Sequence, residues 1–592
     1  MFLREPLVDS EDSKVVSASA EHGDARCWSE TNCSLSDRVA VVVIACGWVA
    51  LATITNPIAE VILNDDGAYA YSVTSVLEAG SFKLSVWGSA NLFSQVYWGA
   101  LFCLPFGFSY TALRLSTLTI ALAALLALYG LLREAGAGST TALFGVLILA
   151  LNPLFFELSF TFMTDVPFLG FTLVAVYLLV RGVKRQSRME LVLGLLAASA
   201  ALLTRQTGLA LFFALSLIYL MKNELNMRNA IRAAAPSFLG LSVQFSYQTW
   251  LKMTGRITAT FGNTAMAVLD VGSMSMLHAT KHVASGVVFA LLYVGLFMLP
   301  LMLFVGYGPL RDLCRQQRWI AISTSVMLFT AGAVPLLHHH RMPFLPNVLY
   351  DIGLGPVMVR HDAPHGLPSL GPVFWTAVTV ISILTAALVL QILISAVLLL
   401  VRTRGQNQEL LLMLLATGVI YFVPIPFVPQ LYDRYLLLFV PLTTVVSFMM
   451  CRRGNTLSLG WTALGVLCLL TCGAFSIAAT HDYLAWNRPR WRALRTLTVT
   501  RHIRPEQIDG GYEFYSFYRL PRDETPIGDD FLISFSPVPG YAEADRYTFR
   551  RWLPPAVCTI LVLRKISMVP TVRADGNSHP THGALTSPPM PR

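Results

Sequence analysis

Long apolar runs recur through most of this chain, and they constrain its fold more than any other feature. Hydrophobic residues make up 55% of the 592 residues, charged residues only 13%, and the mean hydropathy is +0.58. Runs of about 15 to 25 apolar residues have the length of membrane-crossing helices and are too long for barrel strands. A spanning segment must also satisfy its own backbone hydrogen bonds. The sequence therefore predicts an all-α polytopic membrane bundle embedded in a lipid bilayer.

Basic residues indicate how the bundle is oriented. Clusters of Lys and Arg follow alternate apolar runs, and short loops rich in these residues face the cytoplasm. This explains the net charge of +9 without nucleic acid as a partner. We predict a cytoplasmic N-terminus, an outer C-terminal region and about thirteen spans. The spans are expected near 38–58, 111–132, 139–156, 166–181, 190–204, 207–221, 233–250, 284–305, 318–337, 373–401, 409–427, 432–450 and 458–478.

The apolar stretch 92–108 is not counted as a span. Counting it would invert the side of every later basic cluster, and its Gln95, Trp98 and Pro105 suit an amphipathic or re-entrant segment at the outer interface. With this assignment, the loops expected on the outer face are 59–110, 251–283 and 338–372.

The chain divides by composition into four parts. Residues 1–37 are polar and are expected to form a disordered cytoplasmic leader, and 38–478 form the transmembrane module. The segment 479–570 predicts a small extracytoplasmic α/β domain, and 571–592 predict a disordered tail. In the α/β domain we expect a helix at HDYLAWNRPRWRALRTL and strands at IDGGYEF, FLISFSPV and CTILVLRK. Its aromatic residues, such as Tyr512, are assigned no binding role.

Carboxylates at the outer ends of two apolar runs are the candidate catalytic residues. Asp65 and Asp66 lie in LNDDGAYAY, and Asp165 lies in FTFMTDVPF. The charge pattern places all three on the same outer face, where they can share one site. Helix capping is the alternative for each position, with Pro167 in the first turn after Asp165. A cap explains one carboxylate of the Asp65–Asp66 pair, however, and not both.

Several segments occur in an order that resembles a known family. The acidic pair is followed by the Arg of FSYTALRLS, by TDVPF, by LTRQTG and by DRYLLLFVPL. Together they resemble family 39 of the GT-C glycosyltransferases, which includes protein O-mannosyltransferases and the bacterial aminoarabinose transferase of lipid A. The resemblance is best over 38–210 and recurs near 338–356 and 421–443.

The resemblance implies a multispan hexosyl- or pentosyltransferase of the cell inner membrane. Such an enzyme takes a sugar from a polyprenyl-phosphate-linked donor and passes it, with inversion, to a protein, lipid or glycan acceptor outside the cytoplasm. The base then corresponds to Asp65 or Asp66, of which we favour Asp65, and Asp165 matches the second acidic position of the family. A carboxylate can accept the proton of the attacking acceptor hydroxyl.

Outer-face cations are the candidate ligands for the donor phosphate. These are Lys83, Arg114, Arg205 and Arg434. A guanidinium near hydrocarbon needs an anion or a wet cavity, which a lipid phosphate would satisfy at Arg205. Snorkelling or a loop carboxylate would also satisfy Arg205, and Asp433 is an alternative partner for Arg434.

One family feature is missing from this chain. Many relatives carry a Lys-Pro-Pro-Leu stretch after the acidic pair, where this chain has Ser89–Gln95. The Lys of that stretch has no aligned match, and Lys83 lies upstream of it. Arg114 does match a basic position of the family. The missing Lys leaves both phosphate recognition and donor identity open.

The outer loop 338–372 combines a histidine cluster with a candidate lid. His338, His339 and His340 are consecutive, and His361 and His365 follow. Adjacent residues on a short loop rarely converge on one metal, so we favour a pH-sensitive or headgroup-contacting surface. A divalent metal is left open as a cofactor, but the sequence supports none.

In the same loop, PFLPNVLYDIGLGP is typical of an ordered lid. Asp351, within this segment, and Tyr69 are the candidate acceptor or lid contacts.

Two other classes of protein compete with the enzyme. A transporter or flippase of a lipid-linked or anionic substrate would also need outward arginines and a cavity, but transporters usually show repeated halves and ionisable residues near the midplane. A membrane scaffold would not need the acidic pair. The sequence therefore favours a glycosyltransferase.

Overall fold

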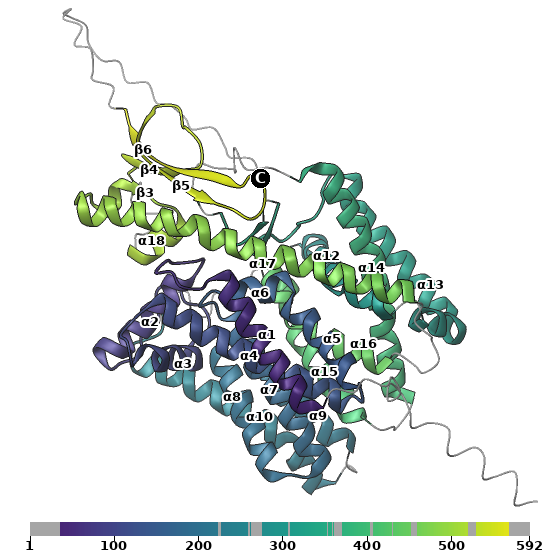
Figure 1. The fold of residues 1–592 in the computed structure, drawn as a ribbon. Coiled ribbons are helices and arrows are strands. Elements are labelled where there is room, and N and C mark those ends of the chain that lie inside the picture. The colour runs from purple at the N-terminus through teal and green to yellow at the C-terminus, as the bar shows by residue number, and fades with distance from the viewer. Residues whose placement is uncertain are drawn as a thin grey trace, which may run out of the picture.

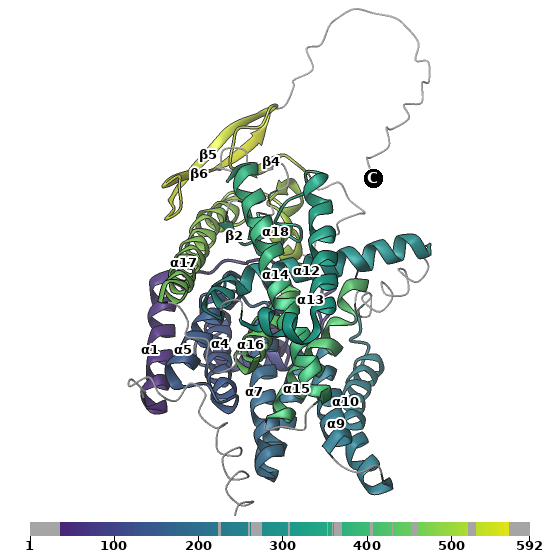
Figure 2. The same ribbon diagram turned by 90° about the vertical axis from the view of Figure 1, so that its right-hand side faces the viewer.

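The computed structural model is a helical bundle that carries a small β-sheet at one end (Figures 1 and 2). It describes residues 36–222, 226–258, 261, 275–305, 308–351, 353–357, 359, 370–402, 407–428, 430–450, 459–518 and 528–566. The leader 1–35 and the tail 567–592, where disorder was predicted, lie outside the described residues.

The N-terminal half is a series of helices joined by short connections, with two small helices, α2 and α3, between α1 and α4. Its helices are α1 (Asp37–Thr55), α2 (Asp66–Ala79), α3 (Phe93–Cys103), α4 (Tyr110–Glu134), α5 (Ser139–Ala150), α6 (Pro153–Ser159), α7 (Asp165–Arg185), α8 (Arg188–Thr204), α9 (Leu209–Lys222) and α10 (Met227–Met253). Polar caps fix several starts: Ser36 caps α1, Ser109 caps α4 and Asn152 caps α6, each by accepting backbone N–H groups.

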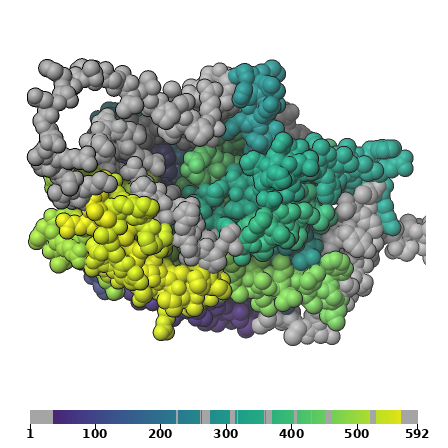
Figure 3. All heavy atoms as spheres, turned by 90° about the horizontal axis from the view of Figure 1, so that it is seen from above, coloured from purple at the N-terminus to yellow at the C-terminus, as the bar shows by residue number. Residues whose placement is uncertain are grey.

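The second half contributes longer helices and then the sheet. Its helices are α12 (Met276–Val305), α13 (Gly308–Leu337), α14 (Gly371–Arg402), α15 (Gln408–Phe422), α16 (Phe439–Met450), α17 (Leu459–Arg495) and α18 (Tyr512–Tyr518). A hairpin of β1 (Leu349–Tyr350) and β2 (Gly353–Leu354) lies in the loop between α13 and α14. Seen from above, α12 to α14 and the C-terminal sheet occupy different halves of one face (Figure 3).

The structure does not confirm the predicted count of thirteen spans. In the described part of the chain, nine helices are long and apolar enough to cross a membrane, or ten if α5 and α6, which are bent by 67°, form one span. The difference arises at α8, α9 and α10. The first two have 17 and 14 residues, about 26 and 21 Å at 1.5 Å per residue, against a hydrocarbon core of about 30 Å. Polar residues in α10, such as Gln244 and Gln248, lower its hydropathy.

The segment 92–108 forms a helix that is too short to cross a bilayer. Its helix α3 has 11 residues, about 16 Å at 1.5 Å per residue. Three polar contacts tie α3 and the residues just before it to the bundle. Gln95 donates to the carbonyl of Phe162, and Asn91 donates to Gln244 and to the carbonyl of Leu202. These hydrogen bonds hold α3 against the segment that leads into α7, the last turn of α8 and α10.

The C-terminal region is built on the last long helix. The expected span 458–478 and the expected helix 481–497 form one continuous helix, the 37-residue α17. Above it lies a sheet of order β3-β4-β6-β5, which comprises β3 (Ile508–Asp509), β4 (Phe531–Ser534), β5 (Tyr541–Arg550) and β6 (Val557–Lys565) (Figure 1). The pair β3–β4 is parallel, and β6 pairs antiparallel with β4 and β5.

Two strand predictions in this region were wrong in detail. IDGGYEF forms only the two residues of β3, because Gly511 turns the chain at φ +88° and Tyr512 then begins α18. The strand β5 was not predicted, since YAEADRYTFR is largely exposed and lacks the clear apolar alternation of a half-buried strand. The strands expected at FLISFSPV and CTILVLRK correspond to β4 and β6.

Candidate active site

Two Asp–Arg ion pairs lie beside one tyrosine ring at one end of the bundle. Asp165 at the start of α7 contacts Arg205 at 2.7 Å, and Asp65 before α2 contacts Arg434 at 3.3 Å. Both guanidinium groups lie over the ring of Tyr435, at 5.3 and 5.6 Å from its centroid. Segments more than 350 residues apart in the chain thereby form one polar cluster.

Asp65 is the carboxylate of this cluster that is partly open. Its side chain is 19% exposed, whereas that of Asp165 is 1% exposed. It stands at the N-cap of α2, but its side chain makes no capping hydrogen bond. Instead Oδ2 accepts from Arg434 and Oδ1 accepts from the Tyr512 hydroxyl at 2.9 Å. The capping alternative therefore does not describe its carboxylate.

Asp66 lies beneath the site, fully buried. Its Oδ1 accepts the backbone N–H of Phe162 at 2.7 Å, which fixes the segment that leads into α7. Burial raises the pKa of Asp66 to about 7, although the nearby Arg114 opposes this shift. Its contacts suit a structural acceptor better than a base open to substrate.

Replacing Asp66 by Asn tests this assignment. The folded-state pKa of about 7 lies above the ordinary 3.8, so folding favours the protonated form, and the stability from Asp66 falls as pH rises from about 4 through 7. Asn is always neutral and keeps an acceptor for Phe162. We expect the wild-type unfolding temperature to fall between pH 5.5 and 8 by more than that of Asp66→Asn, measured in detergent. Arg114, Asp65 and Glu157 are the titratable neighbours of Asp66, and the substitution leaves their side chains in place.

An equal pH dependence in the two proteins would contradict the burial argument. Loss of most transfer activity in Asp66→Asn would assign Asp66 a role in the chemistry.

Asp165 and Arg205 form the tighter of the two ion pairs. Asp165 is the first residue of α7, after the N-cap residue Thr164, and Pro167 occupies the first turn. Its Oδ1 accepts from Arg205, and Oδ2 is buried with no hydrogen-bond partner in the described residues. Among the alternatives for Arg205, the structure shows a salt bridge with a carboxylate. It also shows the Arg205 side chain still 17% exposed.

Asp433 does not pair with the guanidinium of its neighbour Arg434. Its fully buried carboxylate accepts the backbone N–H groups of Val348, Leu349 and Arg434, at 2.7 to 3.1 Å. The alternative partner proposed from sequence is therefore wrong, and Asp433 instead anchors the loop that carries β1. Arg434 reaches Asp65 and lies over the ring of Tyr432 at 5.2 Å. Adjacency in sequence suggested the wrong partner because the two side chains diverge.

Arg114 is engaged elsewhere, so the structure does not support its prediction as a phosphate ligand. It is fully buried in α4, and its guanidinium donates to the carbonyls of Pro57, Ala59 and Val61. These bonds hold the chain that leads to Asp65. Lys83 is exposed and makes no ion pair with any described residue.

The two predicted acceptor or lid contacts differ in position. Tyr69 is buried in α2, and burial, followed by the charge of Asp65, raises the pKa of its hydroxyl while Arg434 and Arg205 oppose the shift. It therefore lies within the cluster. Asp351 lies apart from it and accepts from the backbone of Leu370 and the indole of Trp375, so it fastens its loop to α14.

The structure shows no metal centre among the residues that it describes. No group of three or more His, Cys, Asp or Glu side chains in that part of the chain could hold an ion. His338, His339 and His340 are exposed at the end of α13, and His361 and His365 lie outside the described residues.

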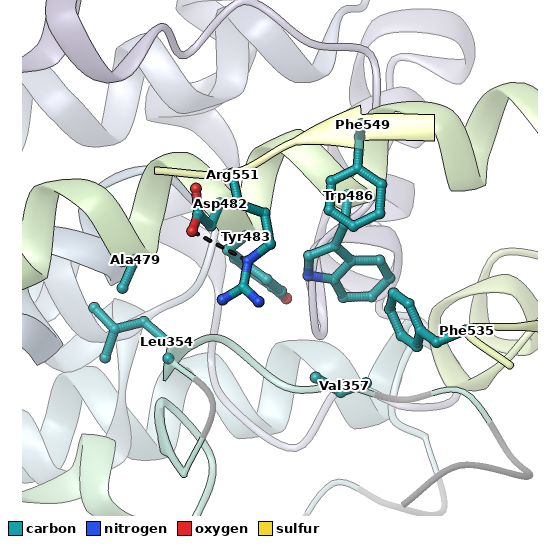
Figure 4. A pocket seen from close by; sticks show the side chains of 10 residues that line it. Leu354, Val357, Ala479, Asp482, Tyr483, Trp486, Phe535, Phe549 and Arg551 are labelled. Carbon is teal, nitrogen blue, oxygen red and sulfur yellow. Dashed lines mark hydrogen bonds and ion pairs between the residues drawn. The ribbon is translucent and has the colours of Figure 1, made fainter. Parts of the chain in front are cut away.

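A pocket lies away from the charged cluster, between α17, β2 and the C-terminal sheet (Figure 4). Aromatic rings of Trp486, Phe535 and Phe549 line it, and Arg551 bonds Asp482 within it at 3.2 Å. None of the four charged residues around Tyr435 contributes to its wall.

Comparison with known proteins finds a family match over part of the chain. Residues 96–250 match the family model described as dolichyl-phosphate-mannose-protein mannosyltransferase. The resemblance to the GT-C glycosyltransferases is confirmed. The matched mannosyltransferase region runs from α3 to α10 and contains Arg114, Asp165 and Arg205, but not Asp65 or Arg434. No curated protein matches the chain.

Solved structures of GT-C enzymes resemble the chain at low identity. ArnT from Cupriavidus metallidurans bound to undecaprenyl phosphate is 12% identical, with a TM-score of 0.43, over 82% of this chain and 76% of ArnT. The apo oligosaccharyltransferase of Archaeoglobus fulgidus is 14% identical, with a TM-score of 0.42, over 83% of this chain and 60% of its own. The S. cerevisiae Pmt1–Pmt2 complex bound to the sugar donor is 17% identical, with a TM-score of 0.30, over 38% of this chain and 34% of its own.

The arrangement offers two kinds of chemistry side by side. Asp65 is a partly exposed carboxylate that can accept a proton, and Arg205 and Arg434 are guanidinium groups that can bind a phosphate in bidentate fashion. Sequence analysis predicted these charged residues, but it did not mention Tyr435, gave Asp433 the wrong partner and assigned no role to Tyr512. The motif DRYLLL contained two of them, whereas no local signal marked Tyr512.

Proposed function

We propose that this multi-pass membrane glycosyltransferase uses a polyprenyl-phosphate-linked sugar and transfers it, with inversion, to a hydroxyl acceptor on the extracytoplasmic side. The observation that supports the proposal most directly is the pairing of Asp65 with Arg434 next to Asp165 and Arg205. We place the enzyme in a bacterial inner membrane with the N-terminus in the cytoplasm. The charge pattern of its loops supports this orientation.

In the proposed reaction, Asp65 is the general base. The acceptor oxygen forms a bond to the anomeric carbon while the bond from that carbon to the phosphate oxygen breaks. The proton of the acceptor hydroxyl passes to Asp65, and the electron pair of the broken bond stays on the phosphate. Asp65 suits this role because its carboxylate is the more exposed of the two in the ion pairs.

Arg434 is the proposed ligand for the departing phosphate. The donor is a phosphodiester with one negative charge, and the released polyprenyl phosphate gains a second as the carboxylate of Asp65 becomes neutral. The contacts from Arg434 to Asp65 measure 3.3 and 3.4 Å, longer than the 2.7 Å between Arg205 and Asp165. Arg434 is therefore the guanidinium that exchanges its partner more easily.

Asp165 and Arg205 complete the proposed site. The short contact and deep burial of Asp165 suit a fixed pair that holds the Arg205 guanidinium beside the ring of Tyr435. Arg205 then places positive charge near the phosphate, on which negative charge develops as the bond to the sugar breaks.

A panel of polyprenyl-phosphate sugars tests the function and the role of Arg434 together. We expect the purified protein to cleave at least one donor, and Arg434→Gln to raise the KM for that donor by about tenfold or more, since a hydrogen bond to a charged group contributes about 1.5–3 kcal/mol. Release of polyprenyl phosphate is the measurement. The control is Arg501→Gln, which removes an exposed guanidinium bonded to Asp545 and should leave KM unchanged.

Two results would contradict the proposal. Movement of a lipid-linked sugar across vesicles without cleavage of any donor would favour the transporter alternative. An unchanged donor KM in Arg434→Gln would remove Arg434 from the phosphate site.

A further inference from the structure

The C-terminal region supplies a residue to the cluster around Asp65. Tyr512 begins α18, which packs against α2 (Figure 1), and its hydroxyl donates to Asp65 Oδ1 at 2.9 Å across a sequence separation of 447 residues. The indole of Trp87 meets the Tyr512 ring edge-on, with centroids 6.2 Å apart. Asp65 and Trp87, both in the loop region between α1 and α4, therefore contact the hydroxyl and the ring of Tyr512.

The surroundings of α18 fix its position with respect to Asp65. Arg490 of α17 donates to Glu513 at 2.8 Å and to the carbonyl of Gly510 at 2.7 Å, so it holds the residues on both sides of Tyr512. Trp491, the next residue of α17, donates to the carbonyl of Ile62 at 3.0 Å. Two adjacent residues of α17 therefore bind both the segment that carries Tyr512 and the segment that leads to Asp65.

Hydrogen bonding explains what this contact does for the carboxylate. Burial and the neighbouring charge of Asp65 raise the pKa of Tyr512, so its hydroxyl keeps its proton and acts as the donor. A donor at Oδ1 restricts the rotation of the Asp65 carboxylate. Arg434 occupies Oδ2, and the two contacts together set the plane of the carboxyl group.

We propose that Tyr512 is a positioning residue that orients Asp65, so that the C-terminal region is an essential part of the active site. This inference rests on the proposed role of Asp65 as the base. It means that the transmembrane module is incomplete without α18. The acceptor hydroxyl must then approach Asp65 beside the ring of Tyr512.

Tyr512→Phe isolates the hydroxyl, because the ring and its contact with Trp87 are retained. We expect kcat to fall about tenfold with donor KM unchanged, in line with about 1.5–3 kcal/mol for a hydrogen bond to a charged group.

A matched control and a second variant make the result decisive. Tyr518→Phe removes a hydroxyl from the same short helix and should leave kcat as in the wild type. A Tyr512→Phe enzyme with wild-type kcat overturns the inference. If Asp65→Asn keeps full activity, the proposed base is wrong, whereas an inactive Asp65→Asn with a normal Tyr512→Phe rejects only the role of Tyr512.

Discussion

Replacing Asp65 by Asn is expected to lower the rate of sugar transfer by about a hundred- to ten-thousandfold, the usual contribution of general-base catalysis. Asn can still accept the hydrogen bond of Tyr512 but cannot take the proton of the acceptor hydroxyl. Donor binding should persist, because Arg205 and Arg434 remain and Arg434 loses a competing carboxylate. The measurement is transfer to acceptor together with binding of a labelled donor.

The control for this experiment is another carboxylate at the surface. Asp545→Asn removes a partly exposed carboxylate that bonds Arg501, and it should leave transfer unchanged. A folded Asp65→Asn protein that transfers sugar at the wild-type rate would show that Asp65 does not take the proton.

Replacing Arg490 by Met is expected to destabilise the protein by about 3–5 kcal/mol, the usual cost of breaking a buried ion pair by removing one partner. Arg490 and Glu513 are both fully buried, and the guanidinium also lies over the Trp486 and Trp491 rings, at 5.4 and 5.9 Å. The variant leaves Glu513 as a buried carboxylate without its cation. Thermal unfolding in detergent measures the loss, and transfer should fall with it because Glu513 adjoins Tyr512.

Two further variants separate charge from packing. Arg546→Met removes an exposed arginine of β5 and should change the unfolding temperature little. The double substitution Arg490→Met with Glu513→Leu should recover much of the stability, since no unpaired charge then remains buried. A single Arg490→Met variant as stable as the wild type would show that the pair does not hold α18.

The sequence located the charged residues because each stood out against an apolar background. Asp65, Asp165, Arg205 and Arg434 were all found in this way, and the structure brings them together. The sequence could not distinguish the role of Asp65 from that of Asp66, because adjacent residues share the same local pattern. Their difference lies in distant partners: Arg434 and Tyr512 for Asp65, and the backbone of Phe162 for Asp66.

Partners assigned from neighbouring positions proved less reliable. Asp433 adjoins Arg434 in the chain, yet its carboxylate binds backbone N–H groups of a loop about 85 residues away. Arg114 matched a family position, yet its guanidinium binds carbonyls. In both cases a buried polar group found its hydrogen bonds in a segment that local sequence does not reveal.

The sequence by itself determined that this chain is a helical membrane protein that resembles the GT-C glycosyltransferases and that its acids and arginines need a polar site. Hydropathy, charge and the order of short motifs can be read from local sequence, and they suffice for those conclusions. Only the tertiary structure decided that Asp65, and not Asp66, contacts Arg434 and that Tyr512 donates a hydrogen bond to Asp65. Those contacts join segments separated by 40, 369 and 447 residues, and the packing of α17 and α18 brings the most distant of them together.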